Sequence, residues 1–191
     1  MERISMMNSE RLFVVVAFCA VFSAPTLVAA PVCDVSAMIP KDARVFADPG
    51  DSNRWREFQN TEDIPGDDSD AGQSAQFWKD EKGAASADIV EATEDFVIDT
   101  RYCFARSGKL EHIGFEVRTA WGWGYRLRGS INGGVLHRES SEFFGTKDEK
   151  PIPRPSDASD ISEVLKPTLY LTTGKLPFAS LLSRIPRPRQ K

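Results

Sequence analysis

The residues best suited to ligand chemistry are three aromatic side chains that alternate with glycine, namely Trp121, Trp123 and Tyr125. In an extended strand, residues two apart point to the same side, so the three rings would form one row. An exposed row could stack against a sugar ring, an aromatic cell-wall fragment or an extended peptide. A covered row would belong to the hydrophobic core. We favour the covered arrangement, because monomeric soluble proteins rarely leave so large an apolar patch exposed.

Arginines form the second candidate site. Arg126 and Arg128 share one face of an expected strand, and Arg118 is expected beside them on the preceding strand. Guanidinium groups gathered in this way bind carboxylates and phosphates. The simpler alternative is a ladder of cross-strand ion pairs with acidic neighbours such as Glu116, each contributing about 0.2–1 kcal/mol. The three arginines are therefore a candidate anion site that competes with a purely structural interpretation.

Catalytic chemistry has weak support in this sequence. The two histidines, His112 and His137, are expected on different strands, and no nucleophile elbow, phosphate-binding loop, dinucleotide fingerprint or His-Glu-x-x-His motif is present. His112 shares a strand face with Glu116, so an acid–base pair is the one catalytic arrangement to consider. The cysteines and histidines lack the paired spacing of a zinc site. We predict no catalytic residue, no metal and no cofactor, with a secreted hydrolase that uses His112 or His137 as an alternative.

The first thirty residues resemble a secretory signal peptide. An unbroken run of eleven apolar residues covers 12–22, and small side chains at Val28 and Ala30 suit cleavage before Pro31. The run is shorter than the roughly 20 residues that span a bilayer. We expect residues 1–30 to be removed and the mature chain to be secreted or periplasmic, soluble, without an integral membrane segment, and of bacterial origin.

Export determines how the cysteines are interpreted. Cys19 would leave with the signal peptide, so the mature chain keeps Cys33 and Cys103 in an oxidising compartment. We predict a disulfide between them, which would stabilise the fold by roughly 4 kcal/mol on the chain-entropy model. Two unpaired buried thiols are the alternative.

Length and charge favour one acidic domain. Removing residues 1–30 from the chain of 191 leaves residues 31–191, which suits a single domain, and the chain carries a net charge of −4. This balance gives no reason to expect nucleic-acid binding, which calls for a basic surface. Residues 57–76 contain six acidic and no basic side chains and predict an exposed acidic loop, whereas residues 184–191 predict a flexible basic tail.

Apolar side chains recur with a period of two from about residue 86 to residue 144, which predicts a mainly β domain. We expect an antiparallel meander of about five to six strands, with Asn132-Gly133-Gly134 as a hairpin turn. The expected strands cover residues 73–79, 87–93, 96–104, 112–119, 121–131 and 135–144, and short strands are possible at 43–46 and 54–58.

One face of this sheet is aromatic and branched, so it needs a cover. Short helical segments within 156–165 and 176–182 are expected to supply it, and an α+β arrangement is the alternative. The chain resembles no family closely enough to assign an activity. The sequence predicts a non-catalytic β domain that binds an unidentified envelope or extracellular ligand or protein. A structural envelope subunit with a free strand edge near residues 87–93 is a further alternative.

Overall fold

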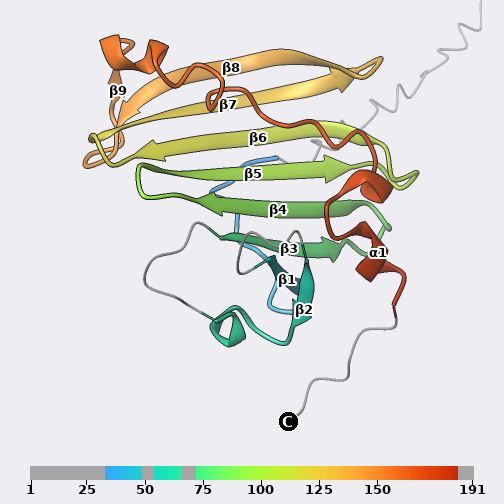
Figure 1. Ribbon diagram of the computed structural model, residues 1–191. Helices are drawn as coiled ribbons and strands as arrows, with labels where there is room; N and C mark the ends of the chain where they lie inside the picture. The colour runs from blue at the N-terminus through green and yellow to red at the C-terminus, as the bar shows by residue number, and fades with distance from the viewer. Residues whose placement is uncertain (1–32, 49–53, 66–71, 185–191) are drawn as a thin grey trace, which may run out of the picture. The chain divides into compact units, whose positions relative to one another are not determined.

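Most strands that are neighbours in the sequence pair with one another, and together the strands form one antiparallel sheet (Figure 1). The computed structural model describes residues 33–48, 54–65 and 72–184, all within the unit 31–191. Nine strands lie in the order β2-β1-β3-β4-β5-β6-β7-β8-β9. They are β1 (Arg44–Asp48), β2 (Arg56–Phe58), β3 (Gln73–Lys79), β4 (Ala85–Ala92), β5 (Phe96–Phe104), β6 (Leu110–Thr119), β7 (Trp123–Asn132), β8 (Val135–Gly145) and β9 (Pro151–Ile152).

The predicted class is confirmed, but the sheet has nine strands instead of five to six. The period-two segments form strands because every second residue faces the core. The hairpin at Gly133 and Gly134 is also confirmed, since Asn132 pairs with Val135 and both glycines have positive φ, 60° and 81°. Such φ values match the twist of a two-residue hairpin turn and favour glycine.

The predicted acidic loop at 57–76 is wrong at both ends. Residues 57–58 belong to β2, and residues 73–76 belong to β3. Polar side chains such as Gln73 and Gln76 suit these strands because each strand buries only part of its surface. Residues 66–71, the predicted signal peptide at 1–30 and tail residues 185–191 lie outside the described residues.

Helical structure is limited to short turns. They are η1 (Thr61–Asp63), η2 (Ser156–Ser159), η3 (Thr173–Lys175) and α1 (Ala179–Leu182). The predicted segment within 156–165 is helical only in its first turn, and the segment within 176–182 is α1. Pro177 restricts the second segment, because proline disfavours helical geometry in the residue before it, and Leu176 is extended with a ψ of 145°. In the described ranges, no helix combines the length and apolar character needed to cross a membrane.

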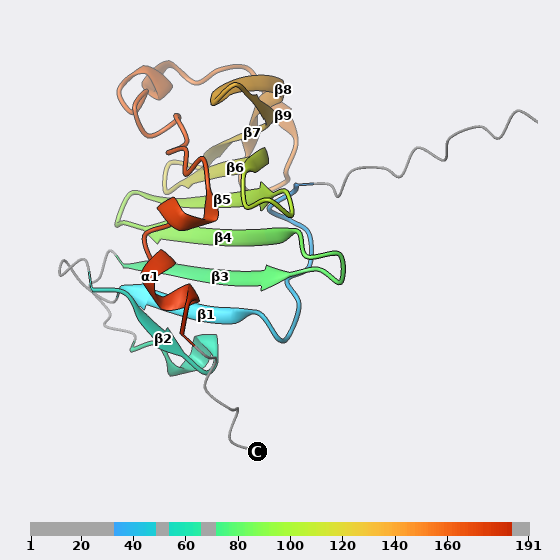
Figure 2. The ribbon, with the colours of Figure 1, turned by 90° about the vertical axis from the view of Figure 1, so that its right-hand side faces the viewer.

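The C-terminal segment 164–182 covers one side of the sheet, which we call the core face (Figures 1 and 2). The ring of Phe178 stacks on Phe46 of β1 with 4.6 Å between centroids. The hydroxyl of Tyr102 on β5 donates a hydrogen bond of 2.9 Å to the carbonyl of Thr168. The expected cover for the aromatic side is therefore present, and it joins opposite parts of the sheet into one core.

The N-terminal segment 33–37 crosses the other side of the sheet, which we call the polar face. The predicted disulfide between Cys33 and Cys103 of β5 is present, with Cα atoms 6.0 Å apart. Gly114 of β6 lies beneath this segment, and a Cβ there would be 2.6 Å from the Cys33 carbonyl oxygen. The absence of a side chain at Gly114 therefore allows the backbone to lie directly on the sheet.

Candidate binding pocket

The aromatic row of the sequence is divided between the core and a turn. Trp123 and Tyr125 are only 5% and 6% exposed, whereas Trp121 is 48% exposed. Trp121 precedes β7, and Gly122 has a φ of 89°, so the chain reverses there instead of continuing as a strand. The Trp123 Nε1 donates a hydrogen bond of 3.1 Å to Asp157. The three rings therefore do not form one stacking row.

Two of the candidate arginines are bound by one carboxylate. Glu149 accepts hydrogen bonds from Arg118 at 2.7 Å and from Arg126 at 3.1 Å. Arg118 also donates to Glu116 at 2.6 Å. The hydrogen bond from Arg118 holds the pKa of the Glu149 carboxyl below its ordinary value. Both guanidinium groups lie near the ring of Phe144, Arg126 at 4.0 Å and Arg118 at 5.3 Å from its centroid.

The third candidate arginine, Arg128, pairs with Asp34 of the N-terminal segment. Partial burial opposes ionisation of Asp34, but hydrogen bonds from Ser36 and the charge of Arg128 together hold its pKa below the ordinary value. The structure thus brings the three predicted arginines to one face and gives each of them a carboxylate partner. This arrangement corresponds to the structural ladder and leaves little free positive charge for an external anion.

One carboxyl group on the same face, that of Asp99, has a raised pKa. Burial and the nearby Asp88 raise the pKa of the Asp99 carboxyl group, on β5, to about 8, while Arg101 opposes the shift. One Asp99 oxygen is buried without a hydrogen-bond partner. Asp88 is already bound to Arg101 at 3.0 Å, and Glu116 lies directly across from Asp99 in the strand register. Asp88 is paired with Arg101 and Glu116 with Arg118, so Asp99 has no cation of its own, and its neutral form is favoured.

His112 does not form the acid–base pair with Glu116 that the sequence left open as an alternative. The Nδ1 of His112 lies 4.0 Å from a carboxylate oxygen of Glu139, while Glu116 is bound by Arg118. His137 is exposed on β8. Neither histidine lines the pocket beside the turns that join β3 to β4 and β5 to β6.

A pocket of about 700 Å³ lies where the core face meets the turns that join β3 to β4 and β5 to β6. We call it the turn-end pocket. Its walls come from the start of β1, the ends of β3 and β5, the start of β4 and the C-terminal segment around α1. It is lined by Asp42, Arg44, Phe77, Trp78, Lys79, Gly83, Ala85, Ala105, Arg106, Ser107, Gly108, Thr173, Leu182 and Arg184.

Register explains why the core is open at this end. Arg44 pairs with Phe77, and Lys79 pairs with Ala85, so all four side chains face the core side of the sheet. Ala85 is small, and the long side chains beside it carry charges at their ends. Of the residues that the C-terminal part of the chain contributes to the lining, Thr173, Leu182 and Arg184, Leu182 alone is apolar. The hydrophobic core therefore ends in a cavity with an apolar floor and a charged rim.

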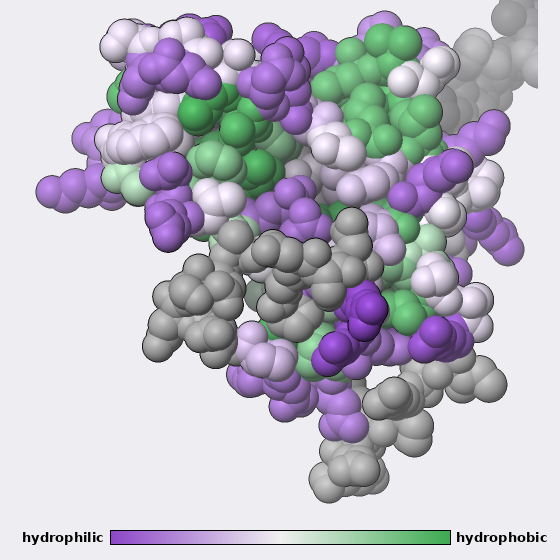
Figure 3. Space-filling view, viewed as in Figure 1, coloured by the Kyte–Doolittle hydropathy of each residue, from purple (hydrophilic) through white to green (hydrophobic). Residues whose placement is uncertain are grey.

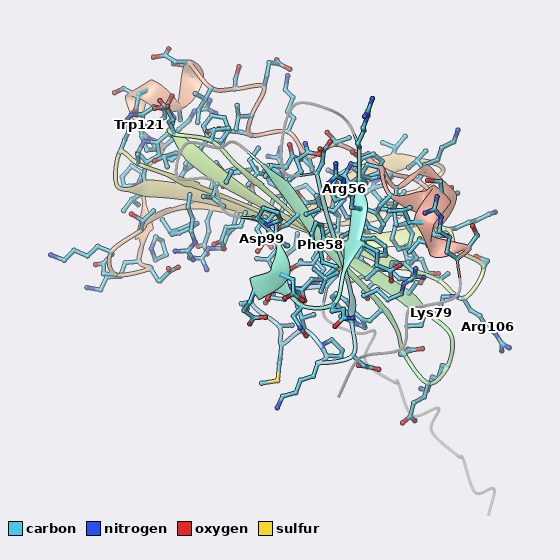
Figure 4. All side chains as sticks on the ribbon, turned by 60° about the horizontal axis from the view of Figure 1, so that its bottom comes forward. Arg56, Phe58, Lys79, Asp99, Arg106 and Trp121 are labelled. Carbon is cyan, nitrogen blue, oxygen red and sulfur yellow. A yellow bond between two sulfur atoms is a disulfide. The ribbon has the colours of Figure 1, made fainter. Side chains whose placement is uncertain are left out.

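The rim is positively charged. The side chains of Lys79, Arg106 and Arg184 make no hydrogen bond or ion pair with any other residue that the structure describes, and Figure 4 shows Lys79 and Arg106 at the same end of the molecule. Arg44 differs, because Glu57 binds its guanidinium through two contacts of 2.8 and 3.0 Å. Asp42 is the one acidic residue in the lining. Three unpaired cations thus face one carboxylate.

Sequence reasoning missed these residues because they come from three distant segments. Lys79 ends β3, Arg106 lies in the turn after β5, and Arg184 follows α1. Each has the character of an ordinary exposed charge in a turn or near an end of the chain. Only strand pairing and the return of the C-terminal segment bring them together, and no local spacing signals that encounter.

Fold and site together define an antiparallel β domain with a cationic pocket at one end of its sheet. Within the described ranges, no group of three or more His, Cys, Asp or Glu side chains is placed to hold a metal ion. No family model, no curated protein and no solved structure matches this chain. The functional argument therefore depends on the geometry of the pocket and of the surfaces around it.

Proposed function

We propose that this chain is an exported, non-catalytic binding domain that holds a small molecule in the turn-end pocket. The observation that carries the proposal is the pocket itself, whose volume of about 700 Å³ lies in the range typical of ligand sites. The apolar run and small residues at 1–30 support export, and so does a disulfide, which persists in oxidising compartments.

The pocket lining favours binding over catalysis. It contains no histidine, cysteine or glutamate, and Asp42 is its one carboxylate. Ser107 and Thr173 supply hydroxyl groups, but activation of a hydroxyl nucleophile needs a general base within hydrogen-bond reach. Lysine and arginine side chains are protonated near pH 7 and suit the recognition of a ligand better than proton abstraction.

A structural role through strand addition is the second candidate, and it requires a different edge from the one expected. The expected edge near 87–93 is interior, because β4 pairs with both β3 and β5. Of the eleven residues of β8, only Phe143 and Phe144 pair with β9. Residues 135–142 of β8 therefore have no outer partner strand among the described residues, which favours β8 for this role.

The uncharged dye N-phenyl-1-naphthylamine tests the proposed function, because its fluorescence rises in apolar surroundings. We expect saturable binding of one dye per chain. Ser107→Trp should abolish it by filling the pocket mouth, since Ser107 is an exposed turn residue in the lining. Ser140→Trp, the same change at an exposed position of β8, should leave it intact. Absence of saturable binding, or equal binding to both variants when circular dichroism shows both folded, would overturn the proposal.

A further inference from the structure

We infer that the ligand of the turn-end pocket is an anionic amphiphile, whose acidic group lies among Lys79, Arg106 and Arg184 and whose apolar part lies against Phe77 and Leu182. This inference rests on the proposed function and adds the chemical class of the ligand. A carboxylate, sulfate or phosphate that carries an alkyl or aromatic group fits the description.

The positive charge of the pocket rim supports the inference that the ligand carries an acidic group. The whole chain carries a net charge of −4, so a local excess of positive charge opposes the average character of its surface. Several arginines elsewhere on the sheet are bound to carboxylates, as in the pairs Arg101–Asp88 and Arg118–Glu116. The three rim cations lack such partners and are offset by Asp42 alone. A concave site with one sign of charge concentrates ligands of the opposite sign.

The apolar floor of the pocket supports the inference that the ligand has an apolar part. Phe77 belongs to the hydrophobic core and is 6% exposed, and Leu182 packs against that core from the C-terminal segment. Ala85 lies between β3 and β5 and leaves space above the sheet. An apolar group placed there would extend the existing core, and each buried methylene would contribute about 0.8 kcal/mol.

An apolar surface lies at the same end of the sheet. Figure 3 shows hydrophobic side chains gathered over the ends of β7 and β8. Val135 and Leu171 are 60% and 41% exposed, and Leu171 lies two residues before Thr173, which lines the pocket. The backbone of this segment is fixed to β6, since Leu110 donates a hydrogen bond to the Leu171 carbonyl at 3.0 Å. A chain longer than the pocket would meet this surface on leaving it.

Competition for the bound dye provides the test, with three decyl compounds used below their micelle-forming concentrations. We expect decyl sulfate to displace N-phenyl-1-naphthylamine at a concentration at least about tenfold lower than decyl glucoside or decyltrimethylammonium, which corresponds to a difference of one favourable charge contact. Inorganic sulfate should not displace the dye. In the double variant Lys79→Gln, Arg106→Gln, the advantage of decyl sulfate should fall about tenfold while displacement by decyl glucoside stays unchanged.

Arg138→Gln is the matched control, because Arg138 is an exposed cation that lines a separate groove of about 300 Å³ beside β8. It should retain the preference for decyl sulfate. Equal displacement by all three decyl compounds would overturn the inference while the proposed function stands. Displacement by inorganic sulfate alone would replace the amphiphile with a small anion. Sedimentation with phosphatidylglycerol vesicles but not phosphatidylcholine vesicles, without displacement by decyl sulfate, would assign the cations to a membrane surface and also overturn it. Failure of the dye to bind at all would overturn the proposed function itself.

Discussion

Removing the disulfide should cost this domain a large part of its stability. The perturbation is the double variant Cys33→Ser, Cys103→Ser, which opens a loop closed across a sequence separation of 70 residues. On the chain-entropy model, a loop of this length contributes about 4 kcal/mol at 25 °C. Domains of ordinary size are stable by only about 5–15 kcal/mol, so the variant should remain folded but close to the limit.

The N-terminal segment links this loss to a buried charge. Arg101 is 3% exposed and donates hydrogen bonds of 2.7 Å to the carbonyl oxygens of Asp34 and Ala37, just after Cys33. Without the disulfide, this segment separates from the sheet more easily, and Arg101 then loses two acceptors. Arg101→Met should therefore destabilise the variant without the disulfide less than the native protein, with a coupling of about 0.5–3 kcal/mol.

Urea unfolding followed by tryptophan fluorescence measures both effects. We expect the urea midpoint to fall for the double variant. In a thermal melt, its melting temperature should drop by roughly 8–16 °C, at about 2–4 °C for each kcal/mol. The native protein treated with a reductant should approach the same midpoint. A difference in unfolding free energy below about 1 kcal/mol would refute a major stabilising role for this disulfide, because it would fall far short of the value expected from loop closure.

Three other features of the sheet give independent predictions. In the folded protein the pKa of Asp99 is about 8, above its ordinary 3.8, so the free energy of unfolding should fall as pH rises from about 4 to about 8, by at most about 1.4 kcal/mol per pH unit. Asp99→Asn should flatten this slope in urea titrations at several pH values. An unchanged slope would exclude Asp99 as its source. Glu149 has a φ of 57°, so Glu149→Gly should be about 1 kcal/mol more stable than Glu149→Gln in thermal melts, and the reverse order would argue against strain there. Gly124→Ala should destabilise by roughly 1–3 kcal/mol, because its Cβ would lie 2.7 Å from the Val117 carbonyl oxygen and 2.8 Å from an atom of the Phe144 ring; calorimetry that shows no loss would contradict the close packing.

Much of the sheet could be predicted because local patterns determine it. Residues 96–104 alternate apolar and polar side chains, and β5 has the same bounds. Patterns failed where a single backbone angle decides the path: Trp121 continues the alternation in sequence, yet the positive φ of Gly122 removes it from the strand. β9 was missed because a pair of residues, Pro151 and Ile152, is too short to show a period.

The candidate sites were harder to predict than the strands. Shared faces for Arg126 and Arg128 follow from the period of two, and both lie where expected. Their partners do not follow, since Asp34 reaches Arg128 only after the N-terminal segment crosses the sheet. The turn-end pocket depends on three segments that meet through the topology of the whole domain, and neither Lys79 nor Arg106 has a sequence neighbour that signals the encounter.

The position of the cover in the chain has a consequence for biogenesis. Ribosomes deliver the amino end first, and from β3 to β9 each strand pairs with the one made just before it, so the sheet can grow hairpin by hairpin during synthesis. Phe178 and Leu181 are synthesised after all nine strands, and until then the aromatic side of the nascent sheet lacks its cover. A stop codon placed before Tyr170 would leave a molecule that keeps its strands but exposes the apolar surface of the core face. Such a late truncation should therefore cause aggregation without loss of β structure.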